Sequence, residues 1–174
     1  MPQDSLPEFM REERDAIIAE IYAAWKGVTR EGGVSWSESS VIDDNGEMEE
    51  RLAARESDTE ESWEGLVTRS DWPGEDGASF GLLDPIGFRY YVAPALIRTL
   101  EGEEIGLRFY LTIELDDHRE YHLEKWSLLD DRQRTCIARA IRLMWDWHGA
   151  TRNLHEACQW QHAYERHWRS VDAE

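Results

Sequence analysis

Two short segments combine histidine with groups that could bind a metal ion or act as a nucleophile. His118 and His122 are four residues apart, a spacing that brings both imidazoles to one face of a helix and could supply two ligands of a zinc site. Hydrolytic zinc motifs need a glutamate next to the first or the last histidine, whereas Glu120 stands midway between them. On a strand the two rings would lie about 13 Å apart, too far to share one ion. We therefore predict that this segment binds no metal.

The second segment contains a cysteine between two histidines. His155, Cys158 and His162 share one face of a helix, and an imidazole beside a thiol can lower the pKa of that thiol. The helical phase places both histidines on the polar edge and Cys158 at the border of the apolar side, where an inert packed thiol would lie. Because no secretory signal is recognisable, we expect Cys136 and Cys158 to be free thiols of a cytoplasmic protein.

Motifs for the common cofactors and nucleophiles are missing from the sequence. The nearest calcium-loop match ends at Gly46 and places Val41 and Leu52 where the two anchoring acids belong. The sequence has no Walker loop, dinucleotide-binding glycine pattern or Gly-x-Ser-x-Gly elbow. We expect no cofactor, and a binding protein rather than an enzyme.

Charge narrows the range of partners. The chain has 174 residues, 37 of them acidic and 19 Lys or Arg, with a net charge of −18, which argues against nucleic acids and anionic membranes as partners. No apolar run is long enough to cross a membrane. Residues 1–76 hold 21 acidic and 7 basic residues, and residues 77–174 hold 16 and 12. The negative field therefore belongs to the N-terminal part.

A run of acidic residues between positions 47 and 64 is the first candidate site, since its only bases are Arg51 and Arg55. Such a run is typical of a solvated helical face, but it could also attract a basic partner. From this second interpretation we predict a protein-interaction domain, in its most concrete form an immunity or inhibitor protein for a basic effector such as a nuclease or toxin. The candidate residues are Glu47, Glu49, Glu50, Glu56, Asp58, Glu60, Glu61 and Glu64.

An aromatic segment gives the alternative site. Arg89, Tyr90 and Tyr91 could line the cleft of a small ligand-binding protein or enzyme. Aromatic residues at helical spacing are, however, typical of a protein core. Both interpretations stay open at this point.

Helical patterns occupy most of the chain. Apolar spacing and capping residues predict helices at 6–26, 47–56, 59–68, 130–147 and 151–170. Asp84 and Pro85 begin a further helix, which Pro94 should end or kink. Residues 29–46 and 69–79 are expected to be long loops. Asp130 with Gln133 forms a capping box, and the wide apolar arc that follows indicates a central helix.

Residues 105–115 contradict this helical pattern. Apolar and polar residues alternate from Leu107 to Leu115, which is typical of a strand. The segment 105–126 could therefore form a β-hairpin. The length fits one domain. We predict a single mainly α domain over 1–174, built around helix 130–147, in which residues 105–126 could form this small hairpin, and keep an α+β domain as the alternative.

The aromatic segment also carries a resemblance to a known family. GFRYYVAPAL resembles an uncharacterised bacterial domain of unknown function whose members have an aromatic-aromatic-Leu-Pro-Ala core between helices. The matching residues are Gly87, Phe88, Arg89, Tyr90, Tyr91, Pro94, Ala95 and Leu96. The pair Val92 and Ala93 departs from the family pattern, which has one residue before the proline. The resemblance implies a mainly helical fold, including residues 103–113, and it implies no catalytic residue.

Overall fold

The computed structural model describes residues 7–73 and 80–172, and these residues form helices and no β-strand. The mainly α prediction is therefore confirmed. The α-helices are α1 (Glu8–Ala24), α2 (Trp36–Asp43), α3 (Met48–Ser57), α4 (Pro85–Leu100), α5 (Leu107–Leu111), α6 (Arg119–Lys125), α7 (Asp131–Ala150), α8 (Leu154–Ala163) and α9 (Arg169–Asp172). Shorter turns are the 3₁₀ helices Trp63–Leu66 and Asp116–His118 and the π-helix Tyr164–Trp168.

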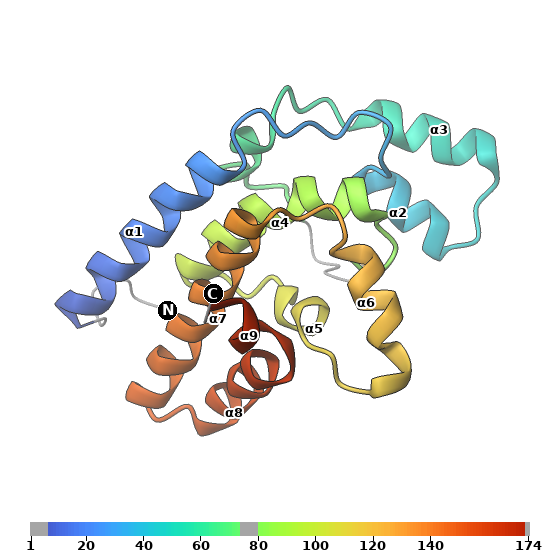
Figure 1. Cartoon of the computed structure of the whole chain (residues 1–174). Coiled ribbons are helices and arrows are strands. Elements are labelled where there is room, and N and C mark those ends of the chain that lie inside the picture. Colours follow the sequence, from blue (N-terminus) through green and yellow to red (C-terminus); the bar gives the residue numbers. More distant parts are fainter. Residues whose placement is uncertain (1–6, 74–79, 173–174) are drawn as a thin grey trace.

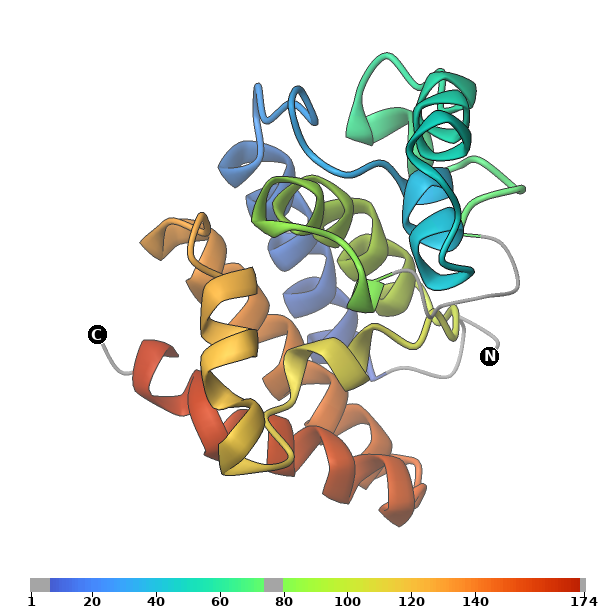
Figure 2. The ribbon, with the colours of Figure 1, turned by 90° about the vertical axis from the view of Figure 1, so that its right-hand side faces the viewer.

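Helix α4 lies at the centre of the molecule, with α2 and α3 at one end and α8 and α9 at the opposite end (Figures 1 and 2). From Phe88 to Leu100 nearly every α4 residue is buried, on all sides of the helix. A helix that is apolar all round must be covered all round. The elements that pack against α4 include α1, α5, α6, α7 and the 3₁₀ helix Trp63–Leu66.

Pro94 lies inside α4, which continues to Leu100, so of the two predicted outcomes, an end or a kink, the end does not occur. A proline inside a helix removes one backbone hydrogen bond and costs about 3 kcal/mol. Burial of the apolar side chains before and after Pro94 offsets this cost, because a break would remove them from the core.

Helix α7 packs against α1, α8 and α9, as predicted for the 130–147 helix. Its start has the predicted capping box between Asp130 and Gln133. The helix continues past the predicted end at 147 and closes where Arg152 adopts a left-handed conformation with φ of 60°. The backbone N–H of Asn153 then donates to the carbonyl of His148 at 2.9 Å. This arrangement closes the helix as a glycine would.

The hairpin predicted at 105–126 does not form. This segment contains α5, the 3₁₀ helix Asp116–His118 and α6 instead. Phe109 and Leu115, two residues of the alternating pattern, are exposed. Carbonyl groups that would pair with a second strand accept from side chains: Trp126 Nε1 donates to Tyr110, and Trp168 Nε1 donates to Leu111 at 2.8 Å. Hydrogen bonds from distant side chains thus take the place of the strand-to-strand hydrogen bonds that the alternating pattern predicted.

Three further boundaries differ from the predictions. The expected loop 29–46 contains α2, because Ser35 and Glu38 form a capping box. The expected helix 59–68 shortens to the 3₁₀ turn Trp63–Leu66, whose two end residues are buried. The expected last helix 151–170 is divided into α8, a π-helix and α9. Of the loop predicted at 69–79, residues 74–79 lie outside the described residues.

Stability should fall under mildly acidic conditions. Burial, with a smaller contribution from nearby arginines, lowers the pKa of His167 from its ordinary 6.5 to about 4. Burial also lowers the pKa of His122 and of His148. As the pH falls, the unfolded chain binds these protons at a higher pH than the folded protein does. The free energy of unfolding therefore keeps the whole contribution of these histidines above about pH 6.5 and falls as the pH approaches 4, by about 1 kcal/mol per pH unit for His167.

Urea denaturation at a series of pH values measures this slope. In the variant His167→Phe, the free energy of unfolding should depend less steeply on pH, because the contribution of His167 is removed. The matched control is His155→Asn, at an exposed position of α8. A slope that His167→Phe leaves unchanged would contradict the assignment.

Candidate functional site

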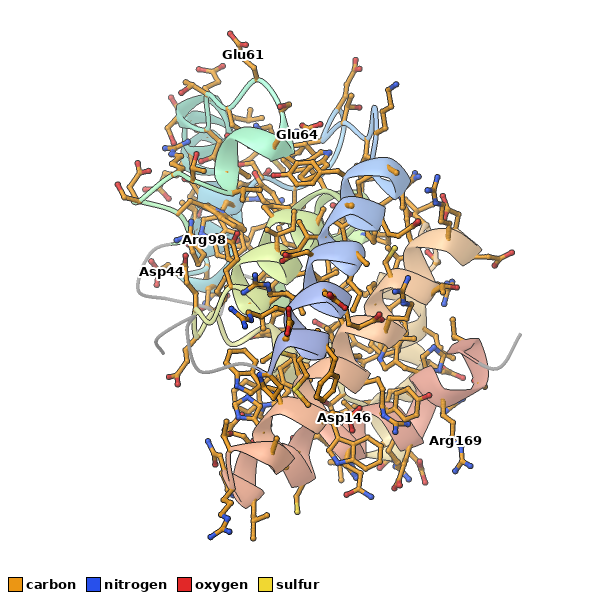
Figure 3. The ribbon with its side chains drawn as sticks, turned by 90° about the vertical axis from the view of Figure 1, so that its left-hand side faces the viewer. Asp44, Glu61, Glu64, Arg98, Asp146 and Arg169 are labelled. Atoms are coloured by element: carbon orange, nitrogen blue, oxygen red, sulfur yellow. The ribbon has the colours of Figure 1, made fainter. Side chains whose placement is uncertain are left out.

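The acidic run lies at the end of the molecule formed by α2, α3 and the 3₁₀ helix Trp63–Leu66 (Figures 1 and 2). Figure 3 shows Glu61 and Glu64 projecting from this end, well away from Asp146 and Arg169. Of the eight candidate residues, six are exposed: Glu47, Glu49, Glu50, Glu56, Glu61 and Glu64. We call these six residues the acidic surface.

The other two candidates, Asp58 and Glu60, are bound within the protein. Asp58 accepts hydrogen bonds from the backbone N–H and the hydroxyl of Ser37, at 2.8 and 2.6 Å. The side chain of Glu60 is only 5% exposed and pairs with Arg30 at 3.0 Å. It also accepts from the Tyr91 hydroxyl at 2.9 Å. Both carboxylates attach the segment after α3 to the core, so they are not available to a partner.

The most important carboxylate of this end is Glu38, which is not among the predicted candidate residues. Its side chain is 1% exposed and forms ion pairs with Arg51 at 3.1 Å and Arg55 at 2.7 Å. Burial by itself raises the pKa of the Glu38 carboxyl, but hydrogen bonds from Arg55, the Ser35 backbone and Arg51 outweigh it, so the pKa lies below its ordinary value. The only available signal was the Ser35–Glu38 capping-box spacing, which lay inside the expected loop.

This buried pairing decides the charge of the acidic surface. Arg51 and Arg55, the two bases of the acidic run, both turn toward Glu38. Within the described residues, none of the six carboxylates of the acidic surface forms an ion pair. Their negative charge is therefore presented to solvent without local compensation.

Helix α3 contributes almost nothing to the core. None of its residues is buried, and its main neighbour is α2. Met48 and Leu52 are 60% and 48% exposed. At 100° per residue, these two positions and those of Glu49 and Glu56 span an arc of about 100° on the helix. The same face of α3 thus combines two exposed apolar side chains with two unpaired carboxylates.

The alternative site is not assembled as one pocket. Arg89 turns toward α7 and donates to the Gln133 side chain at 3.0 Å. Tyr91 is fully buried and accepts from the backbone N–H of Trp36 at 3.0 Å. Tyr90 lines an open pocket beside Arg30 and Glu60. Burial raises the pKa of both tyrosines, as expected of core hydroxyl groups.

The histidine groups also separate in the structure. His118 is exposed, whereas His122 is buried against Trp126. Cys158 is exposed, so its predicted place as a packed thiol is wrong, because the turn of α8 brings Ala157 and Trp160 to the core instead. Cys136 and Cys158 are both free, as expected. Among the described residues, no three potential ligands gather into a metal-binding group.

Comparison with known proteins places this fold and surface in a family. The model of a family of unknown function (DUF6714) matches residues 13–171. The chain belongs to this family. The match runs from within α1 to within α9, so DUF6714 covers α4, α7 and the acidic surface alike. The resemblance to a domain of unknown function is thereby confirmed.

Other comparisons add no relative. Nothing among the curated proteins or the solved structures matches this DUF6714 chain. In the part of the chain that the structure describes, no helix has the length and apolar character needed to span a bilayer. The function must therefore be argued from the surface itself.

Loss of the Glu38 charge should destabilise the protein. In Glu38→Gln, Arg51 and Arg55 lose the carboxylate that holds them, and an amide N–H faces their donors. We expect the free energy of unfolding to fall by about 2 kcal/mol, less than for a fully buried pair because both arginines are partly exposed. Urea denaturation measures this change. The control Glu56→Gln, at an exposed carboxylate, should change stability by less than about 0.5 kcal/mol, and equal effects would contradict the role of Glu38.

The expected absence of metal remains a prediction. Only a ligand that binds the folded state preferentially raises the melting temperature, Tm. We therefore expect the same Tm with and without EDTA for protein purified without a histidine tag. Zinc at one equivalent per chain, lost together with stability on adding EDTA, would contradict this and direct attention to His118 and His122.

Proposed function

We propose that this DUF6714 protein is a binding protein without catalytic activity that captures a basic protein partner on the acidic surface. One observation carries the proposal: Arg51 and Arg55 are engaged by buried Glu38, so the surrounding carboxylates are left without an ion-pair partner among the described residues. Were the run merely a solubilising face, its own arginines could lie among the glutamates and neutralise them.

The proposed contact has both an electrostatic and an apolar part. Unpaired carboxylates steer a basic partner toward the surface and raise the association rate. Met48 and Leu52, exposed on the same face as Glu49 and Glu56, supply the apolar contacts that a stable interface needs near its centre. Because α3 adds so little to the core, its outer face is free to serve binding.

An immunity or inhibitor protein is the form of this function that we favour. Such a protein would cover the cationic surface of a basic effector, for example the groove with which a nuclease or toxin holds its anionic substrate. A net charge of −18 suits that partner and disfavours direct binding of nucleic acid. The two free thiols fit a reducing compartment, and we place the protein in the cytoplasm.

Charge reversal on α3 tests the proposal. Co-purification from native cells should recover a basic protein, whose dissociation constant rises with salt. The double variant Glu49→Lys and Glu56→Lys should weaken this complex at least about tenfold, mainly through slower association. The matched control, Glu12→Lys and Glu124→Lys, makes the same change of charge at exposed positions on α1 and α6 and should have a much smaller effect.

Leu52 provides a test that does not involve charge. Leu52→Ala should weaken the complex and raise its dissociation rate, with unfolding free energy nearly unchanged because Leu52 is exposed. Recovery of no basic protein would overturn the proposal. So would a complex that is insensitive to salt, or one that both charge-reversal pairs weaken equally.

A further inference from the structure

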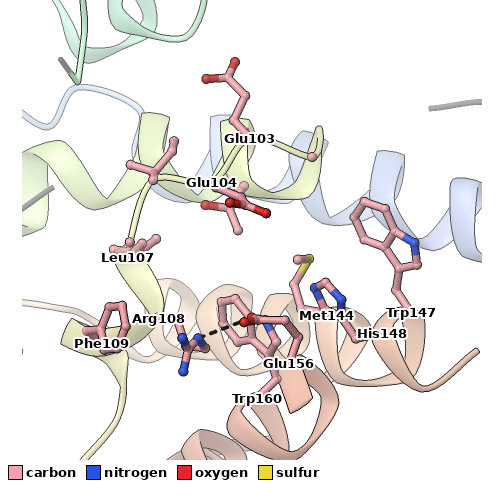
Figure 4. Close-up of a pocket in the computed structure, with 14 residues that line it drawn as sticks. Glu103, Glu104, Leu107, Arg108, Phe109, Met144, Trp147, His148, Glu156 and Trp160 are labelled. Carbon is pink, nitrogen blue, oxygen red and sulfur yellow. Dashed lines mark ion pairs between the residues drawn. The ribbon is translucent and has the colours of Figure 1, made fainter. Parts of the chain in front are cut away.

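A pocket of about 340 Å³ lies at the other end of the molecule from the acidic surface. Its walls come from the end of α4, the loop that follows it, α5, α7 and α8 (Figure 4). Met144, Trp147 and Trp160 make much of the apolar wall. This volume is at the small end of the range for ligand-binding pockets, so an occupant would have the size of one or two rings.

Three side chains that line the pocket have a buried polar atom without a hydrogen-bond partner. They are Thr99 Oγ1, Trp147 Nε1 and His148 Nδ1. The residues are 7%, 4% and 6% exposed. Buried polar groups are almost always paired in native proteins, and each unpaired one is unfavourable. Two of these atoms, Thr99 Oγ1 and His148 Nδ1, can accept a hydrogen bond from a donor in the pocket, whereas the Trp147 N–H can only donate.

The charges around the pocket favour a cation. Glu104 forms no ion pair within the described residues, and its carboxylate points toward the α7 wall (Figure 4). Glu103 points away and pairs with Arg98 at 2.6 Å. Arg108, the only base that lines the pocket among the described residues, lies 3.6 Å from Glu156 and is thereby compensated. An anion would meet uncompensated negative charge here, whereas a cation would find Glu104 as its counterion.

His148 can act as an acceptor toward that cation. Burial lowers the pKa of His148; Arg108 also lowers it, whereas Glu156 and Glu104 raise it, and the net shift is downward. The ring is therefore neutral at neutral pH and has one nitrogen that accepts a hydrogen bond. The Thr99 hydroxyl can accept as well. Together with the indole rings of Trp147 and Trp160, which attract cations to their faces, these groups suit a protonated amine.

We propose that this pocket binds a small organic amine with an apolar or aromatic body. The ammonium group lies between Glu104, His148 and Thr99, and the body packs on Met144, Trp147 and Trp160. The site is independent of the proposed capture of a basic protein, since it shares no residue with the acidic surface.

Three probes of the same shape and different charge test this site. They are phenethylamine, 2-phenylethanol and 3-phenylpropanoate, which are cationic, neutral and anionic at neutral pH. Indole N–H resonances report the binding, and the variants Trp147→Phe and Trp160→Phe assign two of the signals by their loss. We expect phenethylamine to shift both signals to saturation, 2-phenylethanol to bind more weakly, and 3-phenylpropanoate not to bind.

Two variants connect this preference to individual residues. Glu104→Gln, at an exposed residue, should reduce the preference for phenethylamine over 2-phenylethanol by about tenfold, since it removes the counterion. Thr99→Val keeps the shape and removes the hydroxyl, so phenethylamine should bind about fivefold more weakly, the effect of one hydrogen bond. The matched control Glu61→Gln removes one charge from the acidic surface and should leave amine binding unchanged.

Several results would overturn the proposal. One is the absence of any shift of the Trp147 and Trp160 signals with all three probes at millimolar concentration, which would mean that water alone satisfies the buried groups. Another is equal binding of amine and carboxylate, or an amine preference that Glu104→Gln leaves intact. Should Thr99→Val fail to fold, Glu104→Gln decides the question alone.

Discussion

The burial of α4 on every side is the constraint on which the rest of the structure depends. A helix without a polar face requires a separate cover for each side, and the segments before and after it provide these covers. The cover at its N-terminus is especially close. A Cβ atom on Gly87 would meet the Val34 carbonyl oxygen at 2.4 Å, and Asp84 accepts from both the Val34 and Gly87 backbone N–H groups. Glycine is therefore required at position 87.

This close contact also determines how the acidic end of the molecule is arranged. Residues 33–35 lie against the start of α4, which places the cap of α2 and with it Glu38 inside the protein. A buried carboxylate needs cationic partners, and Arg51 and Arg55 supply them from α3. The arginines hold α3 on the surface without burying any of its residues. Helix packing thus sets the charge of the acidic surface.

Tryptophan contributes hydrogen bonds as well as apolar area to this fold. Several buried indole groups donate to carbonyl oxygens. Most of these oxygens lie near helix ends or in turns, where the backbone lacks helical partners, and one, at Arg89, lies inside α4. The donors are Trp25, Trp36, Trp63, Trp126 and Trp168, with acceptors at Arg89, Pro73, Trp25, Tyr110 and Leu111. The buried indole N–H groups of Trp72 and Trp147 depart from this pattern, since neither has a partner among the described residues.

Local features of the sequence determined much of the helical content. The capping box at Asp130, the helix at 47–56 and the start at Asp84 depend on neighbours within a few residues, so they could be predicted. The excess of acid in residues 1–76 is likewise a property of composition. Six of the eight candidate carboxylates lie on the surface for the same reason, since unpaired charge avoids the core.

Only the tertiary structure decided the remaining features, because they depend on contacts between distant segments. Helix α4 continues through Pro94, and the alternating segment after it is not a strand, since burial and indole donors outweigh local preference. The roles of Asp58 and Glu60 within the acidic run were set by Ser37, Arg30 and Tyr91. No periodic pattern in the sequence identifies Glu38 as buried. Nor does any such pattern show that Thr99, Glu104 and His148 line one pocket, because these residues meet only when separate segments of the chain pack together.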